Sequence, residues 1–345
     1  MSSGRLWVVC PSYRDVPSFR LLRTNIELIV KETPALADLD LQFVIVDDTG
    51  GCDDEVWTLQ DFPDVRVIIP PFNLGHQRAI VYGLRKLLAD VADSDLIVTL
   101  DSDGEDRPED LPALLQPLLD PSATGKSLCV ARRTKRSESL QFKVLYTLFR
   151  AMFRTLCGTT VRSGNFAAYR GWLAKRMLLH PYFDLCYSST LISLGFDTIS
   201  VPCPRGERYE GRSRMSPLGL FMHGIRMLMP FTDRIAVRAL TAFSVLFCIG
   251  LLCAGAVVGV RLFTTEAIPG WTTFTLLGMF ILSVVALGNF VVLFAVFFHS
   301  RGISLANLEE WKGTSDGYAP GGPPPAPGRA LGALLLAPAA VAGGA

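Results

Sequence analysis

The pattern of hydrophobic and polar positions divides the chain into two parts. Over residues 1–212, short β-branched runs alternate with helical patterns. The strands that this pattern predicts are Leu6–Val9, Leu41–Val46, Val65–Ile69, Leu96–Leu100, Leu128–Ala131 and Thr198–Val201. The i, i+4, i+7, i+8 spacing of an amphipathic helix is followed by Ile80, Leu84, Leu87, Leu88 and Val91. Strands that alternate with helices favour an α/β fold with a mostly parallel sheet, which places ligands at the carboxyl ends of its strands.

Two long uncharged segments follow. Ala239–Val260 has 22 residues and Phe274–Phe298 has 25. Each is long enough to cross a bilayer core of ~30 Å as a helix, and a pair of buried soluble helices is the alternative. The link between them has one basic residue, Arg261, and more lie outside the pair, at 226, 234 and 238 before it and at 301 and 312 after it. The positive-inside rule then predicts a transmembrane hairpin with both ends in the cytoplasm.

The segments outside the predicted strands and the two uncharged stretches differ in composition from both. Leu140–Leu156 and Leu218–Met229 are amphipathic and basic, which suits the headgroup layer of a membrane or, alternatively, the surface of an ordinary core. From Gly313 onward the chain is rich in Gly, Pro and Ala, and we expect the tail to be mostly disordered. Since the start of the chain does not read as a signal peptide, we expect the N-terminal region to stay in the cytoplasm.

The overall composition narrows the function. The chain has 345 residues, 33 Lys+Arg against 32 Asp+Glu and a mean hydropathy of +0.34. The near-zero net charge argues against a nucleic-acid partner, and the positive hydropathy agrees with membrane segments. The eight cysteines contain no Cys-x-x-Cys pair and the four histidines lie far apart. Neither a zinc ribbon nor a histidine-based metal cluster is therefore expected.

The polar residues after the fourth predicted strand suggest a metal site. In the run Asp101-Ser-Asp103-Gly-Glu105, carboxylates at i, i+2 and i+4 can turn oxygens toward one point. Mg²⁺ and Mn²⁺ prefer oxygen ligands, and Mg²⁺ commonly uses one or two carboxylates together with substrate phosphates. An Asp-x-Asp pair can also be a helix cap or a solvated turn. An EF-hand is excluded, because Asp106 and Pro112 stand where that loop needs Gly and Glu.

Other strand ends carry groups that suit a nucleotide and a phosphate. Asp47 and Asp48 follow the second strand and can accept hydrogen bonds from a base or a ribose. Tyr13 follows the first strand, where its ring either supports a base or packs at the edge of the core. A basic cluster after the fifth strand contains Arg132, Arg133, Lys135 and Arg136. Such a cluster favours bound phosphate over a solvated loop. A second basic cluster spans residues 205–214.

Taken in order, these motifs resemble glycosyltransferase family 2 enzymes with a GT-A fold. The closer resemblance is to membrane-anchored polyprenyl-phosphate glycosyltransferases, such as dolichol-phosphate mannose synthases and the bacterial undecaprenyl-phosphate glucose or aminoarabinose transferases. It covers residues ~5 to 300 and rests on matches at Pro11 and Tyr13, Val46-Asp47-Asp48, Asn73, Gly75 and Ala79, Asp101 and Asp103, and Gly211, Ser213 and Ser216. Two departures are Glu105, where the family usually has Gln, and Gly164-Asn165-Phe166-Ala167, where it has an Asp-Phe-Arg-Leu-like segment.

The resemblance implies a domain plan and a set of site residues. The plan is a GT-A domain at 1–212, a juxtamembrane segment at 213–238, two transmembrane helices at 239–260 and 274–298, and a tail at 299–345. The nucleotide-sugar, UDP- or GDP-linked, would contact Pro11, Tyr13, Asp47, Asp48, Asn73, Gly75 and Asp101. Mg²⁺ or Mn²⁺ would lie on Asp101, Asp103 and Glu105. The acceptor phosphate would contact Arg132, Arg133, Lys135, Arg208 and Ser213, and the catalytic residues would be Asp103 and Arg132.

The implied reaction is an inverting, metal-dependent transfer of a sugar to polyprenyl (undecaprenyl) phosphate at the cytoplasmic face of the inner membrane. A phosphate monoester has a second pKa of ~6 and is already nucleophilic at neutral pH, so no general base is assigned. Membrane lipids are further partners, and a homo-oligomer is compatible with the resemblance. The alternatives are a transferase with another lipid or a polysaccharide acceptor and a non-catalytic nucleotide-binding membrane subunit. The sequence leaves the sugar, the nucleotide and the acceptor open.

Overall fold

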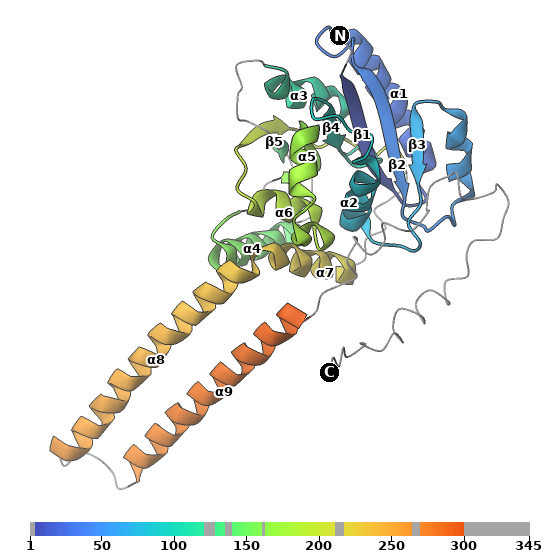
Figure 1. Ribbon diagram of the computed structural model, residues 1–345. Helices are drawn as coiled ribbons and strands as arrows, with labels where there is room; N and C mark the ends of the chain where they lie inside the picture. Colours follow the sequence, from blue (N-terminus) through green and yellow to red (C-terminus); the bar gives the residue numbers. More distant parts are fainter. Residues whose placement is uncertain are drawn as a thin grey trace, which may run out of the picture. The chain divides into compact units, whose positions relative to one another are not determined.

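The computed structural model of the chain describes residues 4–120, 128–134, 140–160, 163–210, 217–263 and 270–299 (Figure 1). Two compact units can be separated. The first contains the described residues of Met1–Ser137 and Arg162–His223, and the second those of Glu138–Val161 and Gly224–Ile303. The predicted phosphate ligands Lys135 and Ser213, and the tail from residue 300, lie outside the described residues.

The first unit is built on a seven-stranded sheet. Its strands are β1 (Arg5–Ser12), β2 (Asp40–Asp47), β3 (Val65–Ile68), β4 (Leu96–Thr99), β5 (Leu128–Arg133), β6 (Ser163–Arg170) and β7 (Thr198–Cys203). They lie in the order β3-β2-β1-β4-β6-β5-β7. All six predicted strands are confirmed. The seventh, β6, was not predicted, and it runs antiparallel to both of its neighbours while the other pairs are parallel.

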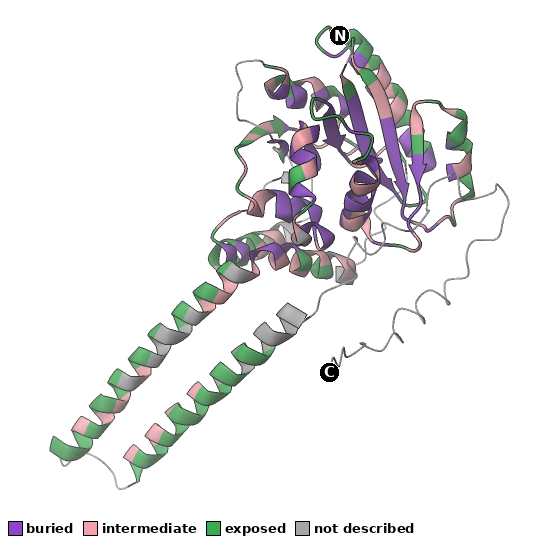
Figure 2. Cartoon of the chain, viewed as in Figure 1, coloured by how far each residue is buried: buried purple, intermediate pink, exposed green. Residues whose placement is uncertain are grey.

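Helices cover both faces of this sheet. The α-helices are α1 (Val16–Glu32), α2 (His76–Leu87), α3 (Leu111–Leu119), α5 (Gly171–Met177) and α6 (Tyr187–Ser193), and the 3₁₀ helices are η1 (Asp54–Asp61), η2 (Pro108–Asp110) and η3 (Pro181–Asp184). Successive strand residues face opposite sides, so Val8 of β1 packs with α1 and α3 while Val9 packs with α2, α5 and α6. Figure 2 shows the central strands buried on both faces. The prediction of an α/β fold with a mostly parallel sheet is confirmed.

The sheet topology places the functional residues. The carboxyl ends of β1, β2 and β4 lie at one edge, because these strands are parallel neighbours. Strand β6 is antiparallel to β4, with Ala167 opposite Thr99 at the end of β4. The beginning of β6 therefore lies at the same edge of the sheet as the ends of β1, β2 and β4.

The second unit is helical. It contains α4 (Leu140–Cys157), the last part of α7 (Pro217–Leu228), η4 (Met229–Phe231), α8 (Thr232–Phe263) and α9 (Trp271–His299). Phe153 of α4 is buried and meets Phe231 edge to face, with 5.4 Å between ring centroids. Arg238 Nη1 of α8 donates to the carbonyl of Thr155 at 2.7 Å, so α4 and the start of α8 pack together.

Helices α8 and α9 run side by side over the two uncharged segments of the sequence (Figure 1). Large apolar side chains along them are exposed, among them Leu252 (75%), Phe263 (87%) and Phe274 (81%). Over the residues that the structure describes, no helix combines the length and the apolar character needed to cross a membrane. Several side chains of α8 and α9 lie outside the described residues, and the predicted hairpin stays a prediction.

Candidate functional site

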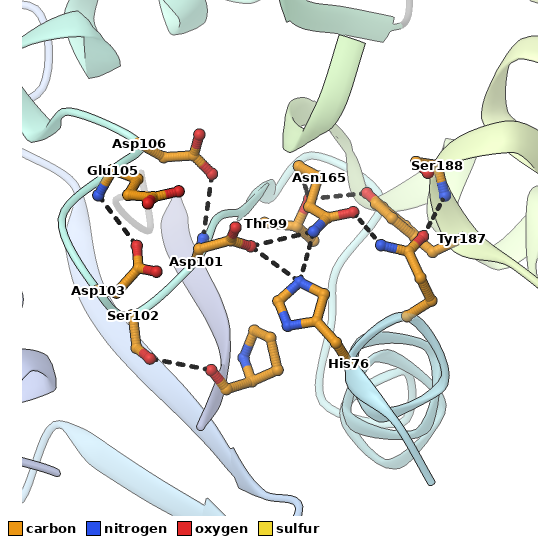
Figure 3. Close-up of polar contacts among 12 residues, drawn as sticks. His76, Thr99, Asp101, Ser102, Asp103, Glu105, Asp106, Asn165, Tyr187 and Ser188 are labelled. Carbon is orange, nitrogen blue, oxygen red and sulfur yellow. Dashed lines mark hydrogen bonds and ion pairs between the residues drawn. The ribbon is translucent and has the colours of Figure 1, made fainter. Parts of the chain in front are cut away.

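The candidate site centres on the turn that follows β4. Residues 101–106 fold back on themselves through two side-chain to backbone hydrogen bonds (Figure 3). The backbone N–H of Asp101 donates to Asp106 Oδ2 at 3.2 Å, and the N–H of Glu105 donates to Asp103 Oδ1 at 3.0 Å. Gly104 has a φ of 83°, a conformation that favours glycine. We call residues 101–106 the acidic turn.

Asp101 is held by polar groups from three other elements. His76 Nε2, at the start of α2, lies 2.9 Å from Asp101 Oδ1, and Asn165 Nδ2 of β6 donates to the same oxygen at 3.0 Å. Arg133 Nη2 of β5 lies 4.0 Å from Oδ2. Burial alone would raise the pKa of Asp101, but His76, Asn165 and Arg133 outweigh it and hold this pKa well below its usual range. Burial lowers the pKa of His76, and Asp101 outweighs it, so the pKa of His76 is raised.

Asp106 is a buried member of the acidic turn that the sequence motif did not include. Its Oδ1 accepts from Arg133 Nη2 at 3.1 Å. Burial, followed by the charge of Asp101, raises the pKa of Asp106 to about 7. Arg133 was predicted to contact an acceptor phosphate, and in the structure its guanidinium lies against the carboxylates of the turn.

A segment after β7, residues 204–210, lies on the acidic turn. The N–H of Gly206 donates to the carbonyl of Glu105, and the N–H of Tyr209 donates to the carbonyl of Asp103, both at 2.9 Å. Arg208 Nη2 lies 2.5 Å from Asp103 Oδ2, and Arg205 Nη2 lies 2.5 Å from Glu105 Oε2. Both oxygens of Glu105 contact arginines, because Arg208 Nε also lies 3.4 Å from Oε1. Burial and the charge of Asp101 raise the pKa of Asp103 to about 6.

The two aspartates after β2 are occupied by backbone groups. Asp47 accepts from the N–H of Thr49 and of Gly51, both at 3.1 Å, and so closes its own turn. Asp48 accepts from the N–H of Leu74 at 2.7 Å and of Gly75 at 3.0 Å, which fixes the loop that leads into α2. Burial raises the pKa of Asp47, and it raises the pKa of Asp48 to about 6 against the opposing effect of the two N–H groups.

The remaining predicted residues lie around this edge of the sheet. The carbonyl of Pro11 accepts from Ser102 Oγ at 3.1 Å, which joins the end of β1 to the acidic turn. Tyr13 is 45% exposed, Asn73 is exposed, and Gly75 has a φ of 83° just before α2. Arg132 is exposed on β5, next to a register shift in the ladder with β6. Their contacts with substrates stay predictions.

Sequence reasoning missed three residues that the structure brings to Asp101. His76 lies inside the Asn73–Ala79 motif. Its position directly after Gly75, at the start of a helix, is the feature of the sequence that could have indicated a site residue. Asp106 follows the Asp-x-Asp-x-Glu run by one position. Asn165 lies at the beginning of an antiparallel strand, whereas the predicted motifs follow the ends of strands.

The acidic turn offers oxygen ligands to a cation. Among the described residues, no group of three or more His, Cys, Asp and Glu side chains is placed to hold a metal ion by itself. Asp101 and Asp103 nevertheless fit a hard divalent cation, because Mg²⁺ is usually bound by one or two carboxylates and completes its shell with water and substrate phosphates. Within the described part of the chain, no hydrogen-bond donor contacts Asp101 Oδ2, and Arg133 Nη2 lies 4.0 Å from it.

Comparison with known proteins identifies the domain that carries this site. Residues 7–177 match the sequence model of Glycosyl transferase family 2. Residues 7–177 of this chain therefore form a glycosyl transferase family 2 domain. The family 2 domain contains most of β1 and all of β2 to β6, and with them the acidic turn, His76, Arg133 and Asn165.

Two curated relatives extend the likeness beyond the family 2 domain. The undecaprenyl-phosphate 4-deoxy-4-formamido-L-arabinose transferase of Proteus mirabilis (strain HI4320) is 26% identical over 295 residues, which cover 81% of this chain and 84% of that protein. The uncharacterized glycosyltransferase YkcC of Bacillus subtilis (strain 168) is 27% identical over 234 residues, which cover 65% of this chain and 68% of that protein.

Among solved structures, the chain is similar to the glucosyl-3-phosphoglycerate synthase of Mycobacterium tuberculosis in complex with Mn²⁺, UDP-glucose and phosphoglyceric acid. The identity is 16% and the TM-score is 0.45, and the match covers 67% of this chain and 80% of that one.

Proposed function

We propose that this protein transfers a sugar from a nucleotide-sugar to a polyprenyl phosphate at the cytoplasmic face of a membrane, with inversion at the anomeric carbon. The observation that carries the proposal is the acidic turn after β4 of a family 2 domain, where Asp101 and Asp103 lie at the carboxyl edge of the sheet. The relative from Proteus mirabilis, named for a transfer that involves undecaprenyl phosphate, supports the choice of acceptor.

The donor would lie along the ends of β1, β2 and β4. The hydrogen bonds of Asp48 to the N–H groups of Leu74 and Gly75 fix the loop at the start of α2, which borders this edge. Pro11, Tyr13 and Asn73 would line the nucleoside. Asp101 and Asp103 would hold Mg²⁺ or Mn²⁺, which offsets the charge of the departing diphosphate when it is bound.

The chemical step needs no proton acceptor from the protein. A phosphate oxygen of the acceptor forms the new bond to the anomeric carbon, the bond from that carbon to the diphosphate breaks, and its electron pair leaves with the nucleoside diphosphate. The acceptor is largely dianionic at pH 7, because its second pKa is ~6. The contribution of the chain is to position two anions against each other. Arg132, which is exposed at the end of β5, would contact the acceptor phosphate. Arg208 would also contact this phosphate once its ion pair with Asp103 is broken.

Helices of the second unit would bring this chemistry to a lipid. The uncharged stretches 239–260 and 274–298 lie within α8 and α9, and a helix of 22 residues spans ~33 Å at 1.5 Å per residue. Exposed apolar side chains such as Leu252 and Phe274 favour a lipid surrounding. On α4, Leu148 is 62% exposed and Met152 is also exposed, which suits a helix that lies in the headgroup layer.

The direct test is an assay of the full-length protein in detergent with undecaprenyl phosphate, Mn²⁺ and a panel of UDP- and GDP-sugars. We expect one donor to give a lipid-linked sugar, and Asp103→Asn to abolish its formation. Asp61→Asn, the same change at an exposed aspartate, should leave the rate unchanged. Product formation that does not respond to Asp103→Asn, or transfer to a soluble acceptor with none to the lipid, would contradict the proposal.

The membrane arrangement has a separate test. Cys52 is an exposed thiol of the first unit. In intact cells a membrane-impermeant maleimide should fail to label it, and labelling should appear after permeabilisation and be lost in Cys52→Ser. Release of the protein by alkaline carbonate, or labelling of Cys52 in intact cells, would contradict a membrane-spanning protein with a cytoplasmic site.

A further inference from the structure

Asn165 contacts the acidic turn through its side chain and the end of β4 through its backbone carbonyl. It is the third residue of β6, it is 8% exposed, and its Nδ2 donates to Asp101 Oδ1 at 3.0 Å (Figure 3). The same nitrogen also contacts His76 Nε2. The carbonyl of Asn165 accepts from Thr99 Oγ1 at 2.6 Å, and Thr99 lies two residues before Asp101. Both contacts join β6 to the end of β4.

The orientation of the Asn165 amide follows from a chain of hydrogen bonds that begins at a backbone N–H, which can donate but cannot accept. The backbone N–H of Ser188, at the start of α6, donates to Gln77 Oε1 at 2.9 Å, and Cys186 Sγ lies 3.4 Å from the same oxygen. Since a backbone N–H cannot accept, the oxygen of Gln77 must face α6, and its NH₂ group must face Asn165. Gln77 Nε2 donates to Asn165 Oδ1, so Nδ2 of Asn165 must face Asp101.

This chain of amides decides which oxygen of Asp101 is engaged. Asn165 and His76 both contact Oδ1, whereas Oδ2 lies 4.0 Å from Arg133 Nη2. The hydrogen bond from Asn165 and the imidazole of His76 both lie on this oxygen and hold the carboxylate in a single rotamer. A reversed Asn165 amide would put its oxygen 3.0 Å from Asp101 Oδ1, and the two acceptors would repel.

We propose that Asn165, oriented by Gln77, is a positioning residue that holds Asp101 Oδ1 and leaves Oδ2 as the oxygen that Asp101 presents to the divalent cation. The assignment rests on the proposed function, because that function supplies the cation. Partners of metal ligands typically contribute ~10–100-fold to metal affinity or activity. Gln77 acts on Asp101 indirectly, because it orients the amide of Asn165. Loss of Gln77 should therefore reduce metal affinity less than loss of Asn165.

The test measures Mn²⁺ binding directly. Mn²⁺ is titrated into the full-length protein in detergent, with saturating UDP and in parallel with GDP, and free Mn²⁺ is followed by electron paramagnetic resonance. We expect the dissociation constant to rise ~10–100-fold in Asn165→Ala and less in Gln77→Met. Gln60→Met, the same change at an exposed glutamine of η1, should match the wild type. The KM for undecaprenyl phosphate should stay unchanged in Asn165→Ala while kcat/KM for the donor falls.

The outcomes separate this inference from the function on which it rests. If Asn165→Ala folds and binds Mn²⁺ within twofold of the wild type, Asn165 is not a positioning residue, whatever the transfer assay gives. If Asn165→Ala fails to unfold cooperatively on heating, Gln77→Met decides by the same measurement, and failure of both variants to fold makes the network structural and overturns the proposal. Absence of Mn²⁺ binding by the wild type with either nucleotide overturns the cation assignment and the positioning role together.

Discussion

The ring of Tyr209 lies against Gly104 in the middle of the acidic turn. A Cβ atom at position 104 would lie 2.6 Å from Cε2 of Tyr209, closer than packed atoms can approach. The hydroxyl of the same tyrosine accepts from Asn25 Nδ2 at 3.0 Å, which ties the ring to α1. The glycine is therefore needed for its positive φ and for the space above it.

Gly104→Ala should destabilise the protein more than an ordinary glycine with positive φ would. A left-handed conformation costs a non-glycine residue roughly 1–2 kcal/mol. The clash with Tyr209 should add about 1–3 kcal/mol, as overpacking does. Gly195→Ala is the matched control, since Gly195 has a φ of 67° and no atom within 4 Å of its Cβ position. Urea unfolding of both variants checks this, and equal losses would contradict a contact between 104 and 209.

Arg132 and Arg133 are neighbours with different surroundings, and their alanine variants should differ. Arg133→Ala leaves the buried Asp106 without its guanidinium and should cost ~3 kcal/mol of stability. Arg132 is exposed, so Arg132→Ala should keep the unfolding midpoint and raise the KM for undecaprenyl phosphate more than that for the donor. Thermal unfolding and two-substrate kinetics give both comparisons. An equal rise of both KM values in Arg132→Ala would place this residue on the donor side.

Asp48→Ala should loosen the loop before α2. The substitution leaves the N–H groups of Leu74 and Gly75 without their carboxylate, and each unsatisfied buried donor costs about 1–3 kcal/mol. Asp53→Ala is a suitable control, because Asp53 caps η1 with one exposed hydrogen bond to the N–H of Glu55. We expect a lower urea midpoint and a raised KM for the donor in Asp48→Ala alone. A stability loss no larger than that of Asp53→Ala would show that the loop does not depend on this carboxylate.

Cation binding should weaken on mild acidification. The pKa of Asp103 is raised from 3.8 to about 6, so a proton competes with the cation for this carboxylate as the pH falls through 6. At an exposed aspartate, a proton would compete with the cation only near pH 4. Mn²⁺ titrations with UDP or GDP between pH 5 and 8 should show the affinity falling below about pH 6.5. An affinity that stays flat down to pH 5 would contradict a cation site that includes Asp103.

The sequence predicted the residues that follow parallel strands better than those that depend on distant parts of the chain. The ends of β1, β2 and β4 were located because apolar runs stop there at polar motifs. Arg133 illustrates the limit. Its basic neighbours suggested a phosphate, but its partner Asp106 lies 27 residues earlier, and no local pattern connects the two. Asn165 illustrates another limit, because the direction of β6 is set by its pairing with β4 and β5 and not by its own residues.

The contacts of the 204–210 segment have a consequence for the order of events at this site. Arg205 and Arg208 are internal counterions of Glu105 and Asp103. An external cation that binds Asp103 must exchange with the guanidinium of Arg208, so its apparent affinity includes the loss of that ion pair. The displaced arginine then keeps Glu105 as its carboxylate partner, and the Nη2 group that faced Asp103 is open to a second anion. Binding of the cation and attraction of a second anion are thereby linked through Arg208. This link favours binding of the nucleotide-sugar donor before the acceptor phosphate.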